Sequence, residues 1–201
     1  MVWYDVTGTL ADWVMAGAAV YAAVNAKQWF SQRSHTKGFD KAEEILSRID
    51  IHFRERNDFI KELHMTYEFL MGVEPGSVSA DPVLIDRYEI LSKKHTNIIV
   101  LLDKLVEDTI LIERWSITIV NIELIKSIIK ALRDLNVSAA NSYNASRSCM
   151  YNFNYMSIIE FGDSHIYFKA HYEEFLRDLH SLEKIYDKFK RTPFKKIFKV
   201  N

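Results

Sequence analysis

Three histidines near the C-terminus are the first residues of this sequence whose type suggests metal chemistry. His165, His171 and His180 are separated by six and nine positions, with several glutamates around them. Two histidines on a helix share one metal when they lie three or four residues apart, because only those spacings put both rings on one side at adjacent turns. This requirement is not met. We predict hydrogen-bonding or solvent-exposed roles for these histidines, and neither a metal nor a cofactor.

Arginine–histidine pairs could carry nuclease chemistry in a helical protein. Helical ribonucleases of the HEPN type need an Arg and a His separated by four to six residues. The separations in this sequence are three residues in one pair and seven in two others, namely Arg48–His52, Arg56–His64 and Arg87–His95. There is also no P-loop, no Rossmann glycine run and no nucleophile elbow. We therefore predict that the protein is not an enzyme.

The sequence contains a single cysteine, Cys149. A disulfide within the chain is impossible, which excludes a secreted scaffold held by disulfides. Free cysteines usually behave as small buried hydrophobic residues, and we expect Cys149 to be one of them.

The composition favours long helices. Hydrophobic residues make up 48% of the 201 residues and charged residues 26%, with only six glycines and three prolines. So few breakers argue against a fold with many turns and β-strands. We predict an all-α fold in which an N-terminal apolar, membrane-type helix precedes a bundle of long helices with heptad patterns.

Charge is distributed unevenly along the chain. Residues 1–26 carry a net charge of −2, residues 27–37 carry +3 and residues 184–201 carry +6, which leaves −8 for the rest. A nucleic-acid-binding protein usually spreads positive charge over a whole face. Direct binding of nucleic acid is therefore not expected.

The N-terminal segment has the character of a membrane anchor. No charged residue occurs from Trp13 to Ala26. This run is shorter than the roughly 18–20 apolar residues of a spanning helix, unless Asp12 and Lys27 lie at the two interfaces. Aromatic residues at both ends suit an interfacial belt. The expected anchor residues are Trp13, Val14, Ala18, Val20, Ala22, Val24, Ala26, Trp29 and Phe30.

The flanks of this segment predict its orientation. Positive residues follow the apolar run and none precedes it, which places the N-terminus outside the inner membrane and the body in the cytoplasm. Small residues at Ala18, Ala22 and Ala26 would allow close helix–helix contact and self-association. Two alternatives stay open: a helix buried in the protein core and, less favoured, a helix lying on the membrane surface.

Three further stripes of apolar residues predict the helical body. The first runs from Phe39 to Leu70 in steps of three and four, interrupted only by Arg56. A second helix is expected to begin at Asp81–Pro82 and to bend near residues 107–109, although β-branched residues make a strand within 109–122 the alternative. The last helix is expected to begin at Asp163–Ser164, after Gly162.

Two segments do not fit the stripes. Residues 136–157 are rich in Asn, Ser and Tyr, and we interpret them as an irregular helix or a long loop, the region best suited to contact a partner. The chain ends in a basic, aromatic tail whose expected contacts with a membrane surface or a partner are made by Lys195, Lys196, Phe198 and Lys199. The predicted parts are thus an anchor with its basic flank at 1–37, a bundle at 38–192 and a tail at 193–201.

The N-terminal thirty residues resemble a style of small bacterial protein. Asp12-Trp13, the alanine-rich run and the segment from Asn25 to Phe30 look like proteins in which one membrane helix continues into a cytoplasmic helical body. Some of these are encoded in prophages and anti-phage systems, including effectors beside retron reverse transcriptases. The resemblance implies an effector or accessory role at the inner membrane, and it assigns no functional residue.

Two functional hypotheses lead, and a third class, an enzyme of unrecognised type, stays open. The first is a non-enzymatic, membrane-anchored protein that acts by helix-mediated association with itself or a partner protein, as a defence effector would. The second is a soluble helical bundle that serves as an interaction module in a larger complex.

Overall fold

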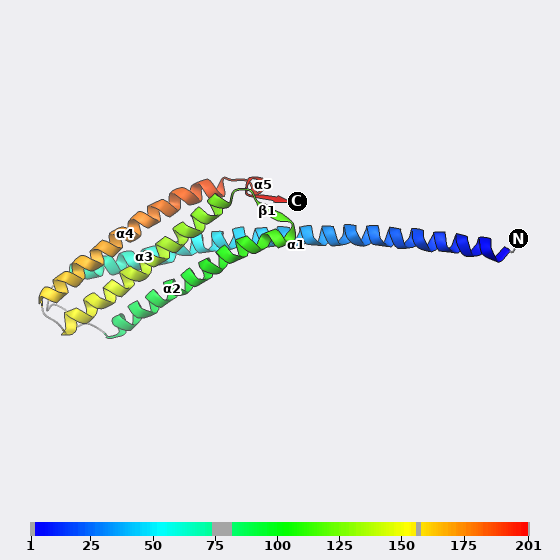
Figure 1. Cartoon of the computed structure of the whole chain (residues 1–201). Coiled ribbons are helices and arrows are strands. Elements are labelled where there is room, and N and C mark those ends of the chain that lie inside the picture. The colour runs from blue at the N-terminus through cyan, green and yellow to red at the C-terminus, as the bar shows by residue number, and fades with distance from the viewer. Residues whose placement is uncertain (1–2, 74–81, 156–157, 201) are drawn as a thin grey trace.

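The computed structural model of the chain is all-α, and four long helices dominate it (Figure 1). It describes the backbone of residues 3–73, 82–155 and 158–200, and their side chains except at 3–11, 31, 34, 153–155, 158–161 and 200. The elements in chain order are α1 (Trp3–Gly72), α2 (Pro82–Leu111), the 3₁₀ helix η1 (Ile112–Trp115), β1 (Ile117–Ile119), α3 (Ile122–Tyr155), α4 (Ile158–Lys190), α5 (Phe194–Ile197) and β2 (Phe198–Val200).

The second half of α1 packs with α2, α3 and α4 into a bundle. α3 lies between α2 and α4 and makes the most extensive helix–helix contacts with both. The first predicted stripe contributes Ala42, Ile49, Leu63 and Leu70 to the core, and each of them is almost fully buried. The prediction of long packed helices is therefore confirmed. The first stripe ends where it was expected to end, since α1 stops at Gly72.

Arg56, which interrupts the stripe, serves the contact between α1 and α4. Its guanidinium lies 3.5 Å from the centre of the Phe53 ring and 3.5 Å from Oε1 of Glu183. Phe53 in turn stacks on Tyr186, with 3.3 Å between ring centres. The long side chain thus covers an aromatic ring while its charge reaches an acidic residue of the neighbouring helix.

The segment 136–157 differs from the loop that we considered. Most of it is the C-terminal half of α3. Among the described residues, α3 is the element with the most buried side chains. Small hydroxyl residues allow it, because Ser142 and Ser146 each donate a hydrogen bond of 2.8 Å to the carbonyl four residues earlier. A buried hydroxyl satisfied in this way takes little space and leaves no lost hydrogen bond.

Three boundaries also differ from the prediction. α4 begins at Ile158, so Gly162 lies inside the helix and Asp163–Ser164 is not its start. α2 continues to Leu111, past the expected bend at residues 107–109. A strand does occur within 109–122, but it is only β1, Ile117–Ile119. The second helix begins at Pro82 as expected, and its predicted capping residue, Asp81, lies outside the described residues.

The basic C-terminal segment is part of the fold. β2 pairs antiparallel with β1, with Ile119 opposite Phe198 and Thr118 opposite Lys199. Phe198 is only 2% exposed, so its expected surface contact is corrected: the ring belongs to the core. Lys195, Lys196 and Lys199 are exposed, because the short helix and strand point these side chains outward.

α1 does not break where the predicted anchor meets the predicted bundle. The helix leaves the bundle at Gly38. Among the described side chains of α1, counted from the N-terminus, Gly38 is the first that is buried. A Cβ atom at Gly38 would lie 2.4 Å from the Trp115 carbonyl oxygen and 2.6 Å from Cγ1 of Ile117. A glycine is therefore what lets η1 and β1 press against α1 at the end of the bundle.

Candidate functional site

The most conspicuous feature outside the bundle is the first part of α1. We call residues 12–37 the arm. It projects away from the bundle as a continuous helix (Figure 1). Between 50% and 76% of the surface of each large hydrophobic side chain on it is exposed, namely Trp13, Val14, Met15, Val20, Tyr21, Val24, Trp29 and Phe30. No described residue of the bundle covers them.

The predicted anchor residues are therefore brought together on the arm and left bare. Ala18, Ala22 and Ala26 are exposed as well. Two polar side chains of the arm contact the arm itself: the Asn25 amide donates to the Tyr21 carbonyl at 3.0 Å, and the Arg33 guanidinium lies 5.0 Å from the Trp29 ring centre. A continuous apolar surface of this kind marks an interaction site on a folded protein.

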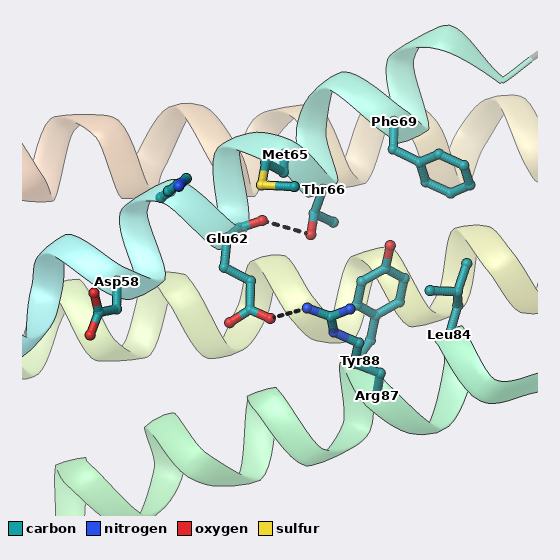
Figure 2. A pocket seen from close by; sticks show the side chains of 9 residues that line it. Asp58, Glu62, Met65, Thr66, Phe69, Leu84, Arg87 and Tyr88 are labelled. Carbon is teal, nitrogen blue, oxygen red and sulfur yellow. Dashed lines mark hydrogen bonds and ion pairs between the residues drawn. The ribbon is translucent and has the colours of Figure 1, made fainter.

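A second feature is a groove between α1 and α2. Between residues 58–69 of α1 and 84–88 of α2, the groove is a cavity of about 400 Å³ with mostly apolar walls. Figure 2 shows Arg87 and Tyr88 reaching from α2 toward α1, where Arg87 pairs with Glu62 at 2.6 Å. The residues that line this part are Asp58, Lys61, Glu62, Met65, Thr66, Phe69, Leu84, Arg87 and Tyr88.

The groove continues along the two helices. A neighbouring cavity of about 630 Å³ shares Asp58 with the first one. Its walls come from one side of α1, including His52 and Phe59, and from α2, including Ile98 and Leu101. The two helices stay apart here because large side chains such as Phe59 and Tyr88 fill the interior between them. Sequence periodicity does not reveal such a gap, since each helix alone shows only its apolar stripe.

Beneath the groove lies a buried polar cluster centred on His95. Its Nδ1 is 2.8 Å from Oδ1 of Asn136, and its ring packs edge-on against Phe59 and stacks on Tyr143. Neither Nε2 of His95 nor the hydroxyl of Tyr143 has a hydrogen-bond partner among the described residues. Burial lowers the pKa of His95 and raises that of Tyr143. Both groups are therefore held neutral at physiological pH.

The burial of His95 predicts a pH dependence of stability. The pKa of the folded state lies below the ordinary value of 6.5, so the unfolded chain takes up the proton first as the pH falls. We expect the free energy of unfolding to decrease below pH 6.5 by up to about 1.4 kcal/mol per pH unit, until the buried ring itself is protonated. Urea unfolding at pH 7.5, 6.0 and 5.0 measures this decrease in the free energy of unfolding.

The control for this prediction is His95→Gln, which keeps a polar group near Asn136 but does not titrate. Its unfolding free energy should change less between pH 7.5 and 5.0 than that of the unsubstituted chain. Burial also lowers the pKa of His165, so His165→Gln serves as the comparison that separates the two contributions. An unchanged slope in His95→Gln would contradict the assignment to His95.

Several of the residues first considered for chemistry form ion pairs with neighbouring side chains. His171 pairs with Glu174 at 3.2 Å, His52 pairs with Glu55 at 3.3 Å, and Arg48 pairs with Asp108. Among the described side chains, no three of His, Cys, Asp or Glu gather closely enough to hold a metal ion.

Cys149 is also without the features of a nucleophile. It is fully buried in α3, and burial raises the pKa of its thiol to about 12. The thiol donates to the Ser164 carbonyl at 3.0 Å. Because the thiolate is the reactive form, a thiol with so high a pKa reacts slowly.

The arm and the groove are thus the two surfaces of the described chain that a partner could occupy. Within the described part of the chain, no helix combines the length and the apolar character that crossing a bilayer requires. Comparison with protein-family models, with curated proteins and with solved structures found nothing that matches this chain.

Proposed function

We propose that the protein is a non-enzymatic assembly module whose arm is its attachment element. The observation that carries this proposal is the exposure of the arm, on which Trp13 is 76% exposed, Tyr21 73% and Phe30 64%. Burying one large apolar side chain contributes on the order of 1.5–3 kcal/mol. A helix that leaves several of them in water therefore has a strong driving force to pack against another helix.

The bundle gives this attachment a rigid support. α1 continues without a break from the arm into the core, where Ile45, Ile49 and Leu63 are nearly inaccessible to solvent. The tight contact at Gly38 holds the helix against Trp115 and Ile117 at the point where it leaves the bundle. A partner that binds the arm is consequently held in a fixed position relative to the bundle, along the axis of α1.

The expected result in cells that express the chain is protection of the arm from a thiol reagent. Val20→Cys and the control Ile166→Cys each replace a hydrophobic residue that is exposed in the single chain, 65% for Val20 and 71% for Ile166. After the cells are opened without detergent and treated briefly with a maleimide polymer, Ile166→Cys should be labelled and Val20→Cys should not. The buried native thiol of Cys149 stays unlabelled in both variants.

Labelling after denaturation shows that both cysteines are competent to react. Equal labelling of the two variants in the native protein would overturn the proposal, because it would show that the arm remains exposed to water.

A second candidate is attachment of the arm to a lipid bilayer. It is favoured by the apolar surface between Trp13 and Ala26, which extends around the whole helix, and by aromatic residues at both ends. These 14 residues extend only roughly 21 Å, against about 30 Å of hydrocarbon, so Asp12 and Lys27 would have to reach opposite interfaces. The exposed Lys195, Lys196 and Lys199 would then face anionic lipid from the cytoplasmic side of the inner membrane.

Alkaline carbonate washing distinguishes the two candidates. Retention of the full chain in the membrane pellet, and its release by Val20→Glu but not by Ile166→Glu, would favour lipid. Recovery in the supernatant with a protected arm would favour helix–helix assembly. The effector role implied by the resemblance predicts growth arrest and membrane leakage on expression, and both should disappear in Val20→Glu.

A further inference from the structure

The arm carries a second periodic face, which shares only Ala26 with the face formed by Ala18, Ala22 and Ala26. Its residues recur in steps of four and three without interruption, and all of them are exposed in the single chain. They are Asp12, Ala16, Ala19, Ala23, Ala26, Phe30, Arg33 and Lys37. A heptad spacing is the pattern by which two helices wind around each other. The alanines at its centre would allow the two backbones to approach closely.

The charges on this face are polarised. Asp12 is the acidic end, while Arg33 and Lys37 form the basic end, with Lys27 beside them. Two parallel arms would place Asp12 opposite Asp12 and Arg33 opposite Arg33, which is repulsive at both ends. Two antiparallel arms would place unlike charges together. Charge therefore favours the antiparallel arrangement with a second copy of the same arm.

The same register aligns the small residues. When Ala19 of one arm lies opposite Ala23 of the other, Ala16 lies opposite Ala26 and Asp12 opposite Phe30. Asp12 is then three residues, or about 4.5 Å along the axis, from the levels of Lys27 and Arg33. Long basic side chains span that distance. Every contact occurs twice, because a two-fold axis between the alanines relates the copies.

The bundle of each copy lies beyond the paired residues 12–30. It begins at Gly38. In the register described, the backbone of residue 3 in one copy lies opposite residue 39 in the other. The two bundles therefore lie at opposite ends of the pair.

We propose that two copies of this chain associate through their arms as an antiparallel helix pair centred between Ala19 and Ala23. This inference rests on the proposed function, since it names the occupant of the attachment element. It requires no change within the bundle, and it covers the face from Asp12 to Phe30 of each arm over about 27 Å of helix.

The test is cross-linking by oxidation of full-length chains that carry single cysteines on the arm. A mixture of Ala16→Cys and Ala26→Cys should form a covalent dimer of the two variants, because these positions face each other. Ala16→Cys alone should not, since its two copies lie ten residues apart. Dimers of Ala16→Cys alone would show parallel arms and overturn the inference, as would the absence of any dimer in the mixture.

Charge reversal provides a second measurement. Asp12→Lys should weaken self-association by about tenfold in sedimentation equilibrium, and Asp12→Lys combined with Lys27→Glu and Arg33→Glu should restore it. Asp163→Lys, an exposed change in α4, is the matched control and should have no effect. Failure of restoration would overturn the charge register.

The outcomes also separate this inference from the proposed function. If Val20→Cys is protected but residues 16 and 26 do not cross-link, the arm is engaged by something other than an antiparallel copy. If Val20→Cys is fully labelled and residues 16 and 26 do not cross-link, the arm is not an attachment element, and both proposals fail.

Discussion

Replacement of Gly38 by alanine is expected to lower the free energy of unfolding by about 1–3 kcal/mol, with a correspondingly lower midpoint in urea. The added methyl group would lie 2.4 Å from the Trp115 carbonyl oxygen, which belongs to the backbone and cannot rotate away. η1 must then move from α1, and the move disturbs the pairing of β1 with β2. Equilibrium unfolding followed by circular dichroism measures the effect.

Gly162→Ala is the matched control, because Gly162 also lies within a helix but has no atom within 4 Å of an added Cβ. Alanine should raise stability there by about 0.5–1 kcal/mol through its better helix propensity. Gly17→Ala on the arm is a second control, because an added Cβ at Gly17 also has no atom within 4 Å. If Gly38→Ala were as stable as Gly162→Ala, the close contact between η1 and the helix would not exist in solution.

The substitution Ser142→Leu is expected to destabilise the bundle by about 3 kcal/mol, the upper end of the range for an overpacked core. Ser142 is fully buried in α3, the helix that packs against both α2 and α4. A leucine needs space that neighbouring helices occupy, so one of them must shift. Thermal and urea unfolding of the purified variant measure the loss.

The control for this substitution is Ser142→Ala, which removes the hydroxyl and keeps the small volume. The hydroxyl donates only to the Ser138 carbonyl of its own helix, and that carbonyl keeps its backbone partner. A change of less than about 1 kcal/mol is expected. Equal loss in both variants would mean that the hydrogen bond, and not the volume, makes this position important.

The helical class of the protein could be predicted from local pattern alone. Apolar residues recur every three or four positions from Phe39 to Leu70. Because Gly and Pro are scarce, few positions would end a helix. A helix is stabilised by neighbours along the chain, so its signal is contained in a short window. The exposed hydrophobic residues of the arm, which no described part of the bundle covers, likewise come from a run that stands out in the sequence.

Other features depended on contacts between distant segments. The Asn- and Ser-rich stretch of α3 looks like a loop in isolation, and it is a buried helix because α2 and α4 close around its small side chains. Phe198 looks like part of a free tail, and it is buried because β2 pairs with a strand about 80 residues earlier. The groove beside Arg87 arises only from the distance between two helices.

The sequence by itself thus determined that long helices dominate the fold, where apolar surface runs along the first of them and how charge is polarised on the arm. The tertiary structure alone decided which of those surfaces is covered. The bundle buries the stripe that begins after Gly38 and leaves the arm bare. The physical reason is that sequence periodicity shows only which side of a single helix is apolar. Burial depends on which other segments pack against that side, and a local sequence pattern does not encode those contacts.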